Sequence, residues 1–232
     1  MIQTQVPGVI GGMGPQATIE FMQRIAQKTG GDCEQNQLRL LIDQNPQIPN
    51  RHTAIVSGKD DVSSVLLKMG RGLQAAGADF IVMPCNTAHA FVQPIQRELD
   101  IPLLSMIERV KLELLRHGGG LRVGLLAADG CLMSGVYHAA LKEGGNDLFT
   151  LSADSQAQFM QLVYRIKSGE LSPQITELVS GLIGELINKG VDILLAGCTE
   201  IPLMMGSSEY PLPCIDTLQI LVEATIQRAY SS

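Results

Sequence analysis

Two cysteines, Cys85 and Cys198, stand at equivalent places in a chain of 232 residues. Residues 77–87 read GADFIVMPCNT and residues 190–200 read GVDILLAGCTE, so a glycine, an aspartate, an apolar run and a cysteine recur at one spacing without a gap. The segment GVIGGMG at 8–14 matches GLLAADG at 124–130 in the same order along the chain. The two pairs of segments are separated by 113 and 116 residues. This self-similarity predicts a duplicated α/β unit.

A pair of thiols suits the inversion of a tetrahedral carbon. One base removes a proton from one face of the carbon, and an acid returns a proton to the other face. A thiol can serve in either role, because its pKa of about 8.5 can be lowered until a thiolate forms near neutral pH. We therefore expect Cys85 and Cys198 to transfer protons, one as thiolate and one as thiol. The other cysteines, Cys33, Cys131 and Cys214, have no such context, and we expect them to be packing residues.

Short polar side chains follow each cysteine. Asn86 and Thr87 come after the first, and Thr199 and Glu200 come after the second. Polar residues and free backbone N–H groups after a strand can form a turn that holds an anion. Such turns would bind a substrate carboxylate and stabilise the charge that develops when the α-carbon loses its proton.

Apolar runs alternate with longer amphipathic segments, which predicts βα units throughout. Continuous apolar runs such as 80–83 and 191–196 are typical of parallel strands that are covered on both faces. Ligands bind beyond the carboxyl ends of such strands, where both cysteines fall. We therefore expect two similar Rossmann-like α/β domains with parallel sheets, related by pseudo-symmetry, with the site in the cleft between them. The expected strands are 8–11, 38–42, 80–83, 122–127, 149–151, 191–196 and 212–215, and the expected helices are 15–28, 62–76, 110–116, 134–142, 159–167, 175–188 and 218–230.

Composition argues against several classes of function. The 17 basic and 23 acidic residues give a net charge of −6, so there is no basic excess to neutralise nucleic-acid phosphates. No apolar run approaches the ~20 residues that span a bilayer, and the N-terminus has no signal-peptide pattern. We therefore expect a cytoplasmic protein with free thiols, because none of its five cysteines lies in a CxxC pair. The histidines show no ligand spacing, which predicts no metal site.

Four motifs carry a family resemblance. They are VIGGMGP at 9–15, NPQIPNR at 45–51, MPCNTAH at 83–89 and GCTEIPL at 197–203, and they span both halves of the chain. With these motifs the chain resembles the cofactor-independent aspartate/glutamate racemases, and most of all the aspartate racemases. The resemblance implies two α/β domains, 1–103 with 211–232 and 104–210, with the C-terminal helix returning to the first. It also implies an interdomain active site, a homodimer, no cofactor, and L- or D-aspartate as substrate, with glutamate as a second candidate.

The resemblance assigns roles residue by residue. It places the two catalytic cysteines at Cys85, for the D-face, and Cys198, for the L-face. It makes Arg51 the group that holds the substrate carboxylate through a bidentate fork, and Lys167 the group that holds the side-chain carboxylate. Relatives with broader substrates carry threonine at the first cysteine, so cysteine there favours acidic substrates. The remaining substrate-lining positions are Gly12, Met13, Gln47, Asn86, Thr87, Thr199 and Glu200.

Three other readings remain open at this point. Residues 12–17, GMGPQA, fit a dinucleotide-binding fingerprint and would suggest an NAD-dependent oxidoreductase, with Asp43 as its acidic residue. Pro15 weighs against this, because it lacks an N–H for a pyrophosphate. A related cysteine-dependent isomerase or decarboxylase of dicarboxylic acids is the second reading, and a non-enzymatic acid-binding protein is the third. We expect His89 to be structural.

Overall fold

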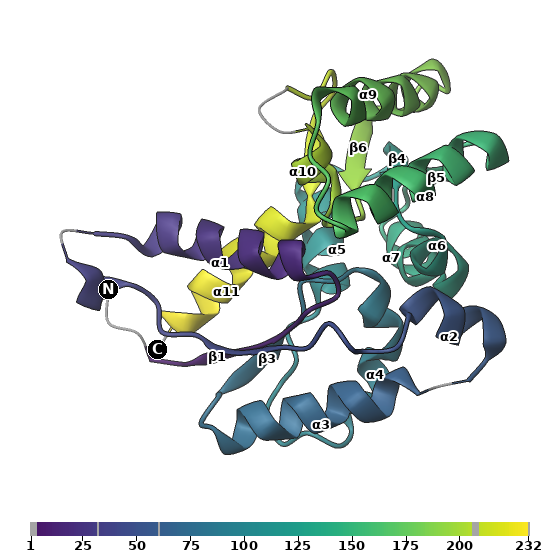
Figure 1. Ribbon diagram of the computed structural model, residues 1–232. Coiled ribbons are helices and arrows are strands. Elements are labelled where there is room, and N and C mark those ends of the chain that lie inside the picture. Colours follow the sequence, from purple (N-terminus) through teal and green to yellow (C-terminus); the bar gives the residue numbers. More distant parts are fainter. Residues whose placement is uncertain (1–3, 32, 60, 206–208, 232) are drawn as a thin grey trace. The chain divides into compact units, whose positions relative to one another are not determined.

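The computed structural model describes residues 4–31, 33–59, 61–205 and 209–231, and the chain divides into two compact units (Figure 1). Unit 1 comprises Met1–Met106 and Leu218–Ser232, and unit 2 comprises Ile107–Thr217. The first unit therefore contains the C-terminal end of the chain as well as its beginning. The observed α/β fold with two parallel sheets confirms the expected fold class.

Unit 1 is built on a parallel sheet with the strand order β2-β1-β3. Helix α1 begins with Pro15 at its first turn, where a missing N–H costs no hydrogen bond. The elements of this unit are β1 (Pro7–Gly11), α1 (Pro15–Thr29), η1 (Glu34–Asn36), β2 (Leu41–Gln44), α2 (Arg51–Ser57), α3 (Val62–Ala75), β3 (Phe80–Val82), η2 (Thr87–Phe91), α4 (Val92–Gln96) and most of α11 (Thr217–Ala229).

Strands β1 and β3 of the first sheet are buried on both faces, as their continuous apolar runs predict. Val9 and Val82 pack in one cluster with side chains of α1 and α11. Their neighbours Ile10 and Ile81 pack in a second cluster with side chains of α3 and α4. Figure 1 shows α1 and α11 on one side of the sheet and α3 on the other. Successive residues of each strand thus serve opposite faces.

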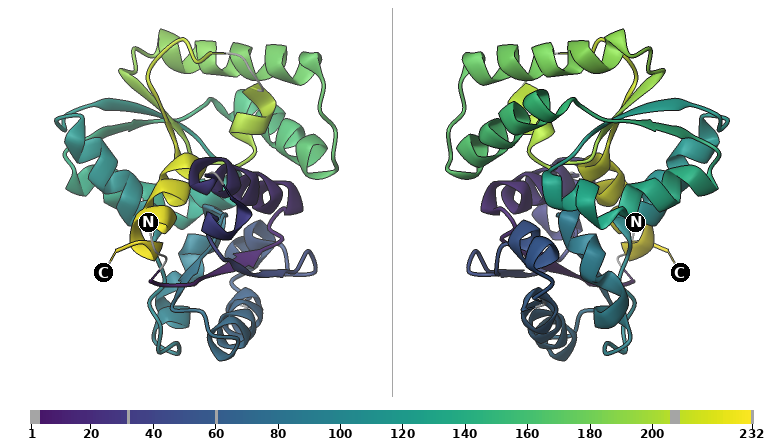
Figure 2. Two further views of the ribbon diagram at one scale, coloured as in Figure 1. Left: turned by 90° about the vertical axis from the view of Figure 1, so that its left-hand side faces the viewer. Right: turned by 90° about the vertical axis from the view of Figure 1, so that its right-hand side faces the viewer.

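Unit 2 has a parallel sheet with the strand order β5-β4-β6-β7. Leu126, Leu194 and Ala196 of its central strands pack against side chains of α8 and α9, and Figure 2 shows these helices together on one side of the sheet. The elements are α5 (Met106–Arg116), β4 (Arg122–Leu126), α6 (Asp129–Ser134), α7 (Val136–Glu143), β5 (Asp147–Phe149), α8 (Ala153–Lys167), α9 (Pro173–Asn188), β6 (Ile193–Ala196), α10 (Ile201–Met205) and β7 (Cys214–Asp216).

The internal repeat extends to the register of the strands. In unit 1 Val9 pairs with Val82, and in unit 2 Leu125 pairs with Leu195, which are the corresponding positions of the two copies. A side-chain clamp recurs as well: the aspartate just before β3 and the aspartate just before β6 each accept a backbone N–H from the start of the neighbouring strand, β1 or β4. Asp79 accepts from Val6 at 2.6 Å, and Asp192 accepts from Arg122 at 2.8 Å.

The two units also share a fourth position at the edge of the sheet. In unit 2, β7 pairs with β6 through Cys214 and Leu194. In unit 1, Leu103 forms a single parallel bridge to Ile81, which occupies the same place in the repeat as Leu194. In each case the chain passes into the other unit directly after this segment, at residues 106–107 and 217–218.

The expected domain boundary at 210–211 differs from the observed one, because β7 pairs with β6 and keeps residues up to Thr217 in unit 2. Three edge strands lie at other residues than expected. The strand expected at 38–42 forms at Leu41–Gln44, the one expected at 149–151 forms at Asp147–Phe149, and the one expected at 212–215 forms at Cys214–Asp216. The backbone of the central strand selects which residues of an edge segment are paired, and the apolar pattern does not carry that information.

Two helical segments also differ from expectation. Helix α2 is not among the helices expected from the sequence, and it begins because the Asn50 side chain accepts N–H groups from His52 and Thr53 at 2.9 and 3.2 Å. The helix expected at 134–142 is replaced by α6 and α7, which meet at Gly135 with a φ of 69°. A left-handed residue interrupts the helical hydrogen bonds there.

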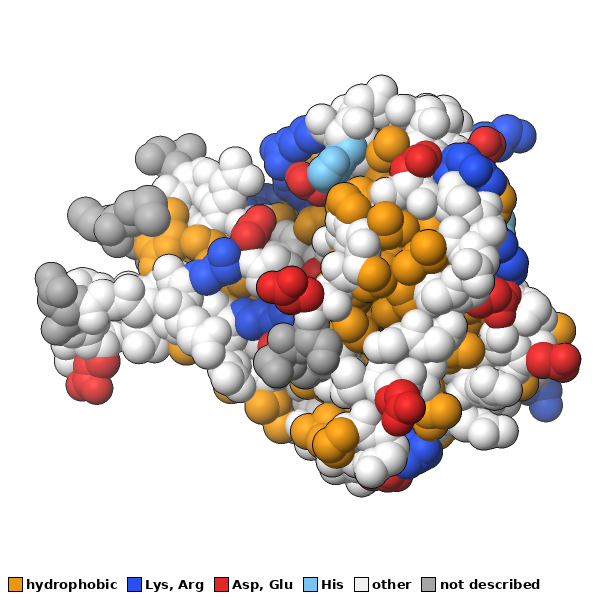
Figure 3. Space-filling view, turned by 90° about the horizontal axis from the view of Figure 1, so that it is seen from above, with side chains coloured by type: hydrophobic (Ala, Val, Ile, Leu, Met, Phe, Trp, Pro, Cys, Tyr) orange, Lys and Arg blue, Asp and Glu red, His pale blue; other side chains and the backbone are white. Residues whose placement is uncertain are grey.

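Across the described part of the chain, no helix combines the length and apolar character needed to cross a bilayer. Figure 3 shows acidic and basic side chains interspersed on one face of the molecule.

Alanine should lower the free energy of unfolding by different amounts at Gly8 and Gly124, the equivalent strand glycines of the repeat. A Cβ on Gly8 would lie 2.9 Å from the Cβ of Ala78, an atom fixed to the backbone, so we expect Gly8→Ala to lower the free energy of unfolding by about 1–3 kcal/mol. Gly124→Ala should cost less, because its Cβ would meet methyl groups of Val191 at 3.2 and 3.3 Å. Urea unfolding measures both changes.

Gly72→Ala is the matched control. Gly72 lies within α3 with open space around it, so alanine there should stabilise the chain by about 0.5–1 kcal/mol. A Gly8→Ala chain as stable as the parent would contradict the close approach of β1 and the segment before β3.

Candidate functional site

The loop after β1 carries the first expected site residues, Gly12 and Met13. Gly12 has a φ of 97°, and a Cβ on it would lie 2.4 Å from the backbone of Asn45, so only glycine fits. Its N–H donates to the Thr18 hydroxyl at 3.0 Å. Met13 is buried in the same cluster as Cys85. The ends of β1, β2 and β3 are thereby packed together.

The loop after β2 carries Gln47 and Arg51. Gln47 is exposed, and its backbone N–H donates to the Asn45 side-chain oxygen at 2.9 Å. Arg51 is partly buried, and its Nη1 donates to the carbonyl oxygens of Ile48 at 3.2 Å and Pro49 at 2.9 Å. Its Nε is buried without a hydrogen-bond partner. Two carbonyl oxygens of this loop therefore hold the guanidinium through Nη1, while the Nε–H has no acceptor.

The loop after β3 carries Cys85. The cysteine is 5% exposed and Asn86 is 3% exposed, while Thr87 is partly buried. The Cys85 N–H donates to the Met83 carbonyl at 2.8 Å, which makes a tight turn directly after the strand. Arg51 and Cys85 thus lie in the same unit, on loops that follow β2 and β3, the two strands that flank β1 in one small sheet.

His89 anchors the cysteine loop. Its Nε2 accepts the N–H of Met106 at 3.0 Å, so its Nδ1 carries the proton and donates to the Cys85 carbonyl at 2.9 Å. Burial lowers the pKa of this imidazole to about 4, although the hydrogen bond to Cys85 opposes that shift. His89 is therefore a neutral link between the cysteine loop and the residue at which the chain leaves unit 1, in keeping with the structural role expected of it.

The second half of the candidate site follows β6. Cys198, Thr199 and Glu200 are all buried. The Cys198 Sγ donates to Glu200 Oε2 at 2.9 Å, and the Thr199 hydroxyl donates to the same oxygen at 3.3 Å. Burial, together with the charge of Glu200, raises the pKa of Cys198 well above its ordinary value. The thiol form is accordingly favoured in the unliganded chain.

Lys167 completes this cluster. It lies in the last turn of α8, and its Nζ is 3.6 Å from Glu200 Oε1. The lysine side chain is 28% exposed and the glutamate side chain 3%. The ion pair therefore connects a buried carboxylate to the surface of unit 2, with Lys167 as its outer member.

Sequence reasoning missed the residues behind Cys198. The Thr217 hydroxyl donates to the Ala196 carbonyl at 2.8 Å, two residues before the cysteine. The buried Tyr137 hydrogen-bonds the Thr217 side chain, and burial raises the pKa of this phenol well above its ordinary value. Thr217 is also the residue at which the chain leaves unit 2. In both units, therefore, the residue at the crossing is hydrogen-bonded to the segment that carries the cysteine.

The expected site residues fall into two groups. Unit 1 holds Cys85 with Gly12, Met13, Gln47, Arg51, Asn86 and Thr87, and unit 2 holds Cys198 with Lys167, Thr199 and Glu200. Of the other cysteines, Cys131 is buried, Cys214 is partly buried and Cys33 is exposed, so Cys33 is not the packing residue that was expected. Among the described residues, no group of three or more His, Cys, Asp or Glu side chains is arranged to hold a metal ion.

The neutral state of His89 predicts a dependence of stability on pH. Below about pH 6.5 the unfolded chain binds a proton that the folded chain does not bind until about pH 4, so stability should fall as the pH decreases through this window. The contribution of His89 is up to about 3 kcal/mol. His89→Gln should flatten the fall in urea-unfolding experiments across the window.

His138→Gln is the control, because His138 is exposed on α7. It should leave the pH dependence of the parent intact. An equal flattening by both substitutions would show that the buried imidazole is not responsible.

Comparison with known proteins gives a consistent family. The chain is 27% identical over 233 residues to the broad specificity amino-acid racemase RacX of Bacillus subtilis, covering 97% of this chain and 99% of that protein. It is 30% identical over 151 residues to the glutamate racemase of Aquifex pyrophilus, covering 64% of this chain and 57% of that protein.

A solved structure agrees over nearly the whole chain. The Picrophilus torridus aspartate racemase superimposes with a TM-score of 0.81 at 28% identity, covering 97% of this chain and 94% of that one. The family model described as Asp/Glu/Hydantoin racemase matches residues 10–225. The chain therefore belongs to the Asp/Glu/hydantoin racemase family.

Proposed function

We propose that this chain racemises aspartate, with glutamate as a second substrate, without a cofactor and through a thiol–thiolate pair. The observation that carries the proposal is the matched position of Cys85 and Cys198. Each follows the strand that pairs in the same register with the first strand of its unit, at the carboxyl end of that strand. The chain belongs to a family of racemases, and racemisation needs a proton donor and a proton acceptor on opposite faces of the α-carbon. The duplicated thiols are our candidates for these two groups.

The proposed chemistry uses the two thiols in alternation. A thiolate on one cysteine removes the α-proton, and the thiol of the other donates a proton to the opposite face of the carbanion. Following the resemblance, Cys198 serves the L-enantiomer and Cys85 the D-enantiomer. Backbone and side-chain donors next to the cysteines, on Asn86, Thr87 and Thr199, would stabilise the charge on the α-carboxylate as the proton leaves.

Two cations favour an acidic substrate. Arg51 offers a buried Nε without a partner, which suits one oxygen of a carboxylate. Lys167 lies at the surface of the Cys198 cluster and suits the second carboxylate of the substrate. The match to an aspartate racemase over nearly the whole chain points the same way, although relatives that act on glutamate or on a broad range of amino acids also match.

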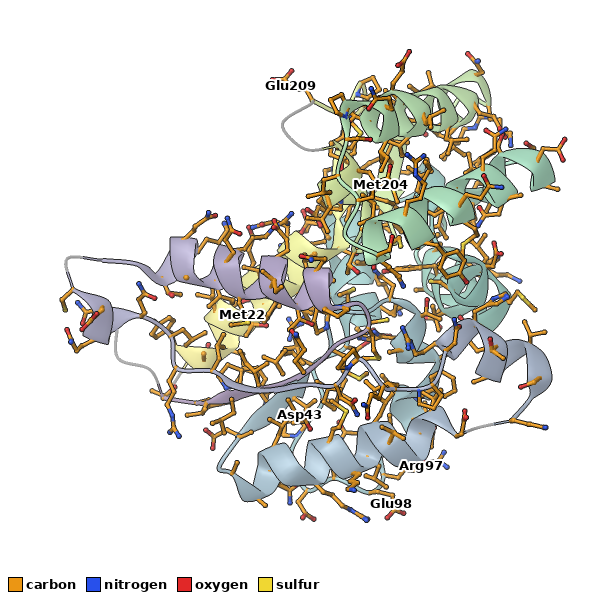
Figure 4. The ribbon with its side chains drawn as sticks, viewed as in Figure 1. Met22, Asp43, Arg97, Glu98, Met204 and Glu209 are labelled. Carbon is orange, nitrogen blue, oxygen red and sulfur yellow. The ribbon has the colours of Figure 1, made fainter. Side chains whose placement is uncertain are left out.

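The other readings are less well supported. Asp43 lies on β2, where a dinucleotide-binding unit would carry its acidic residue, so the turn after β1 has to separate the two hypotheses (Figure 4). The Gly12 N–H is already engaged by Thr18, and Pro15 supplies none, so the turn after β1 offers few donors to a pyrophosphate. An isomerase or decarboxylase of dicarboxylic acids would use the same thiols, and an acid-binding protein would leave them without a role. We also propose that the protein is a cytoplasmic homodimer, as the resemblance implies.

Isotope exchange tests the two-base reaction. L-Aspartate incubated with the protein in D2O, without pyridoxal phosphate, should yield D-aspartate that carries deuterium at the α-carbon. At early times the recovered L-aspartate should carry none, because each face has its own acid. Cys85→Ser and Cys198→Ser should each reduce racemisation roughly 10²–10⁴-fold, because a serine hydroxyl is a far weaker acid than a thiol.

Cys33→Ser is the matched control, because Cys33 is exposed and lies outside both cysteine loops. It should racemise aspartate at the parent rate. Failure of the parent protein to exchange the α-proton of aspartate or glutamate would refute the proposed function. Racemisation that survives either of the two site substitutions would refute the two-base assignment.

Arg51 provides a separate test of substrate binding. Arg51→Lys keeps the charge but removes the fork, so we expect kcat/KM for aspartate to fall roughly 10–100-fold. Arg97→Lys is the control, because Arg97 is exposed beyond the end of α4 (Figure 4). Equal kinetics for the parent and Arg51→Lys would exclude Arg51 as the carboxylate-binding group.

A further inference from the structure

A two-base reaction leaves the protein in a different protonation state from the one in which it began. After an L-to-D turnover, Cys198 holds the proton taken from the substrate and Cys85 has lost its own. Before the next turnover in the same direction, Cys198 must lose a proton and Cys85 must gain one. Cys198 is only 6% exposed, so its proton needs a route to water.

Glu200 is placed to provide that route. It is the one aspartate or glutamate that is buried among the residues the structure describes. A buried carboxylate is costly unless it is well partnered, and the partners of Glu200 include the Cys198 thiol on one oxygen and the Lys167 ammonium on the other. These three groups lead from a buried sulfur to a partly exposed side chain.

We propose that Glu200 carries the proton of Cys198 to and from water, and that Lys167 controls the outer end of this path. This inference rests on the proposed function, because only a two-base reaction requires the reset. The role is that of a positioning and proton-relaying residue, since nothing in it requires Glu200 to touch the substrate.

Each step balances in protons and charge. The thiol gives its proton to Glu200 Oε2, the sulfur keeps the electron pair as a thiolate, and the pair retains one negative charge. Glu200 then releases the proton to water and returns to a carboxylate. The thiolate of Cys85 takes a proton from water, so the chain as a whole consumes none.

The position of Lys167 allows it to control the access of water to Glu200. The 3.6 Å separation from Glu200 Oε1 exceeds the usual length of an N–H···O hydrogen bond, so the lysine does not seal the carboxylate tightly. A substrate carboxylate bound to Lys167 would cover the outer end of the path. The proton on Cys198 would then stay on the sulfur during the turnover and exchange with water only after product release.

Exchange of the thiol proton tests the relay without any racemisation. The S–H stretching band of Cys198 is isolated in the infrared spectrum by subtracting the spectrum of Cys198→Ser. After the protein is mixed into D2O, the band should convert to S–D at least about 10-fold more slowly in Glu200→Gln than in the parent. Glutamine can still accept the thiol hydrogen bond, but it cannot take up the proton.

Rapid mixing with D-aspartate provides the kinetic test, because this direction uses as its acid the Cys198 thiol that is already hydrogen-bonded to Glu200 in the unliganded chain. In Glu200→Gln steady-state turnover should fall at least about 10-fold more than the first turnover does, so that a burst appears. Glu177→Gln is the matched control, because Glu177 is exposed on α9. It should show the parent exchange rate and no burst.

The outcomes separate this inference from the proposed function. S–D exchange in Glu200→Gln at the parent rate would overturn the relay even if the parent protein racemises aspartate. A first turnover slowed as much as the steady state would also overturn it, because Glu200 would then act in the chemical step. Slowed exchange in a protein that racemises neither aspartate nor glutamate would support the relay and refute the proposed function.

Discussion

The parallel pairing of two strands in each unit determines where the functional groups stand. β1 pairs with β3 in the same register in which β4 pairs with β6. An aspartate just before β3 and another just before β6 each accept a backbone N–H from the start of the neighbouring strand, β1 or β4. Because the register is the same, the chain leaves both sheets at the same point. Cys85 and Cys198 follow three residues after the equivalent partners Val82 and Leu195. The cysteine positions are thus a consequence of strand pairing.

That pairing leaves little room for side chains at one place in each sheet. Gly8 and Gly124 occupy equivalent positions, and both face residues of the helix and turn that lead into the next strand. The neighbours also correspond: Ala78 and Leu73 in unit 1, and Val191 and Leu186 in unit 2. The duplication therefore preserves the close contact of α3 with β1 and of α9 with β4. This contact helps to set the point along each sheet at which the cysteine loop begins.

The sequence predicts the repeated features well and the tertiary ones poorly. The cysteines, the glycines and the clamping aspartates recur at a fixed spacing, so one copy identifies the other. The edge strands were misplaced by two or three residues because their register is set by the central strand. The link from Lys167 to Glu200 joins residues that are far apart in sequence and carries no local pattern. The bond from Met106 to His89 depends in the same way on where the chain crosses between units.

The two halves differ at the residues that directly follow the cysteines. In the repeat, Thr87 corresponds to Glu200 and Asn86 to Thr199, so one cysteine loop carries a carboxylate that the other lacks. A carboxylate beside Cys198 favours the thiol form of that residue, since two adjacent negative charges in a buried place are costly. The first loop has no carboxylate at the equivalent position and lies in the unit that contains Arg51. A symmetrical pair of thiols would have no preferred protonation state. The proposed two-base reaction needs one acid and one base at the start, and the carboxylate beside Cys198 makes the two duplicated thiols unequal.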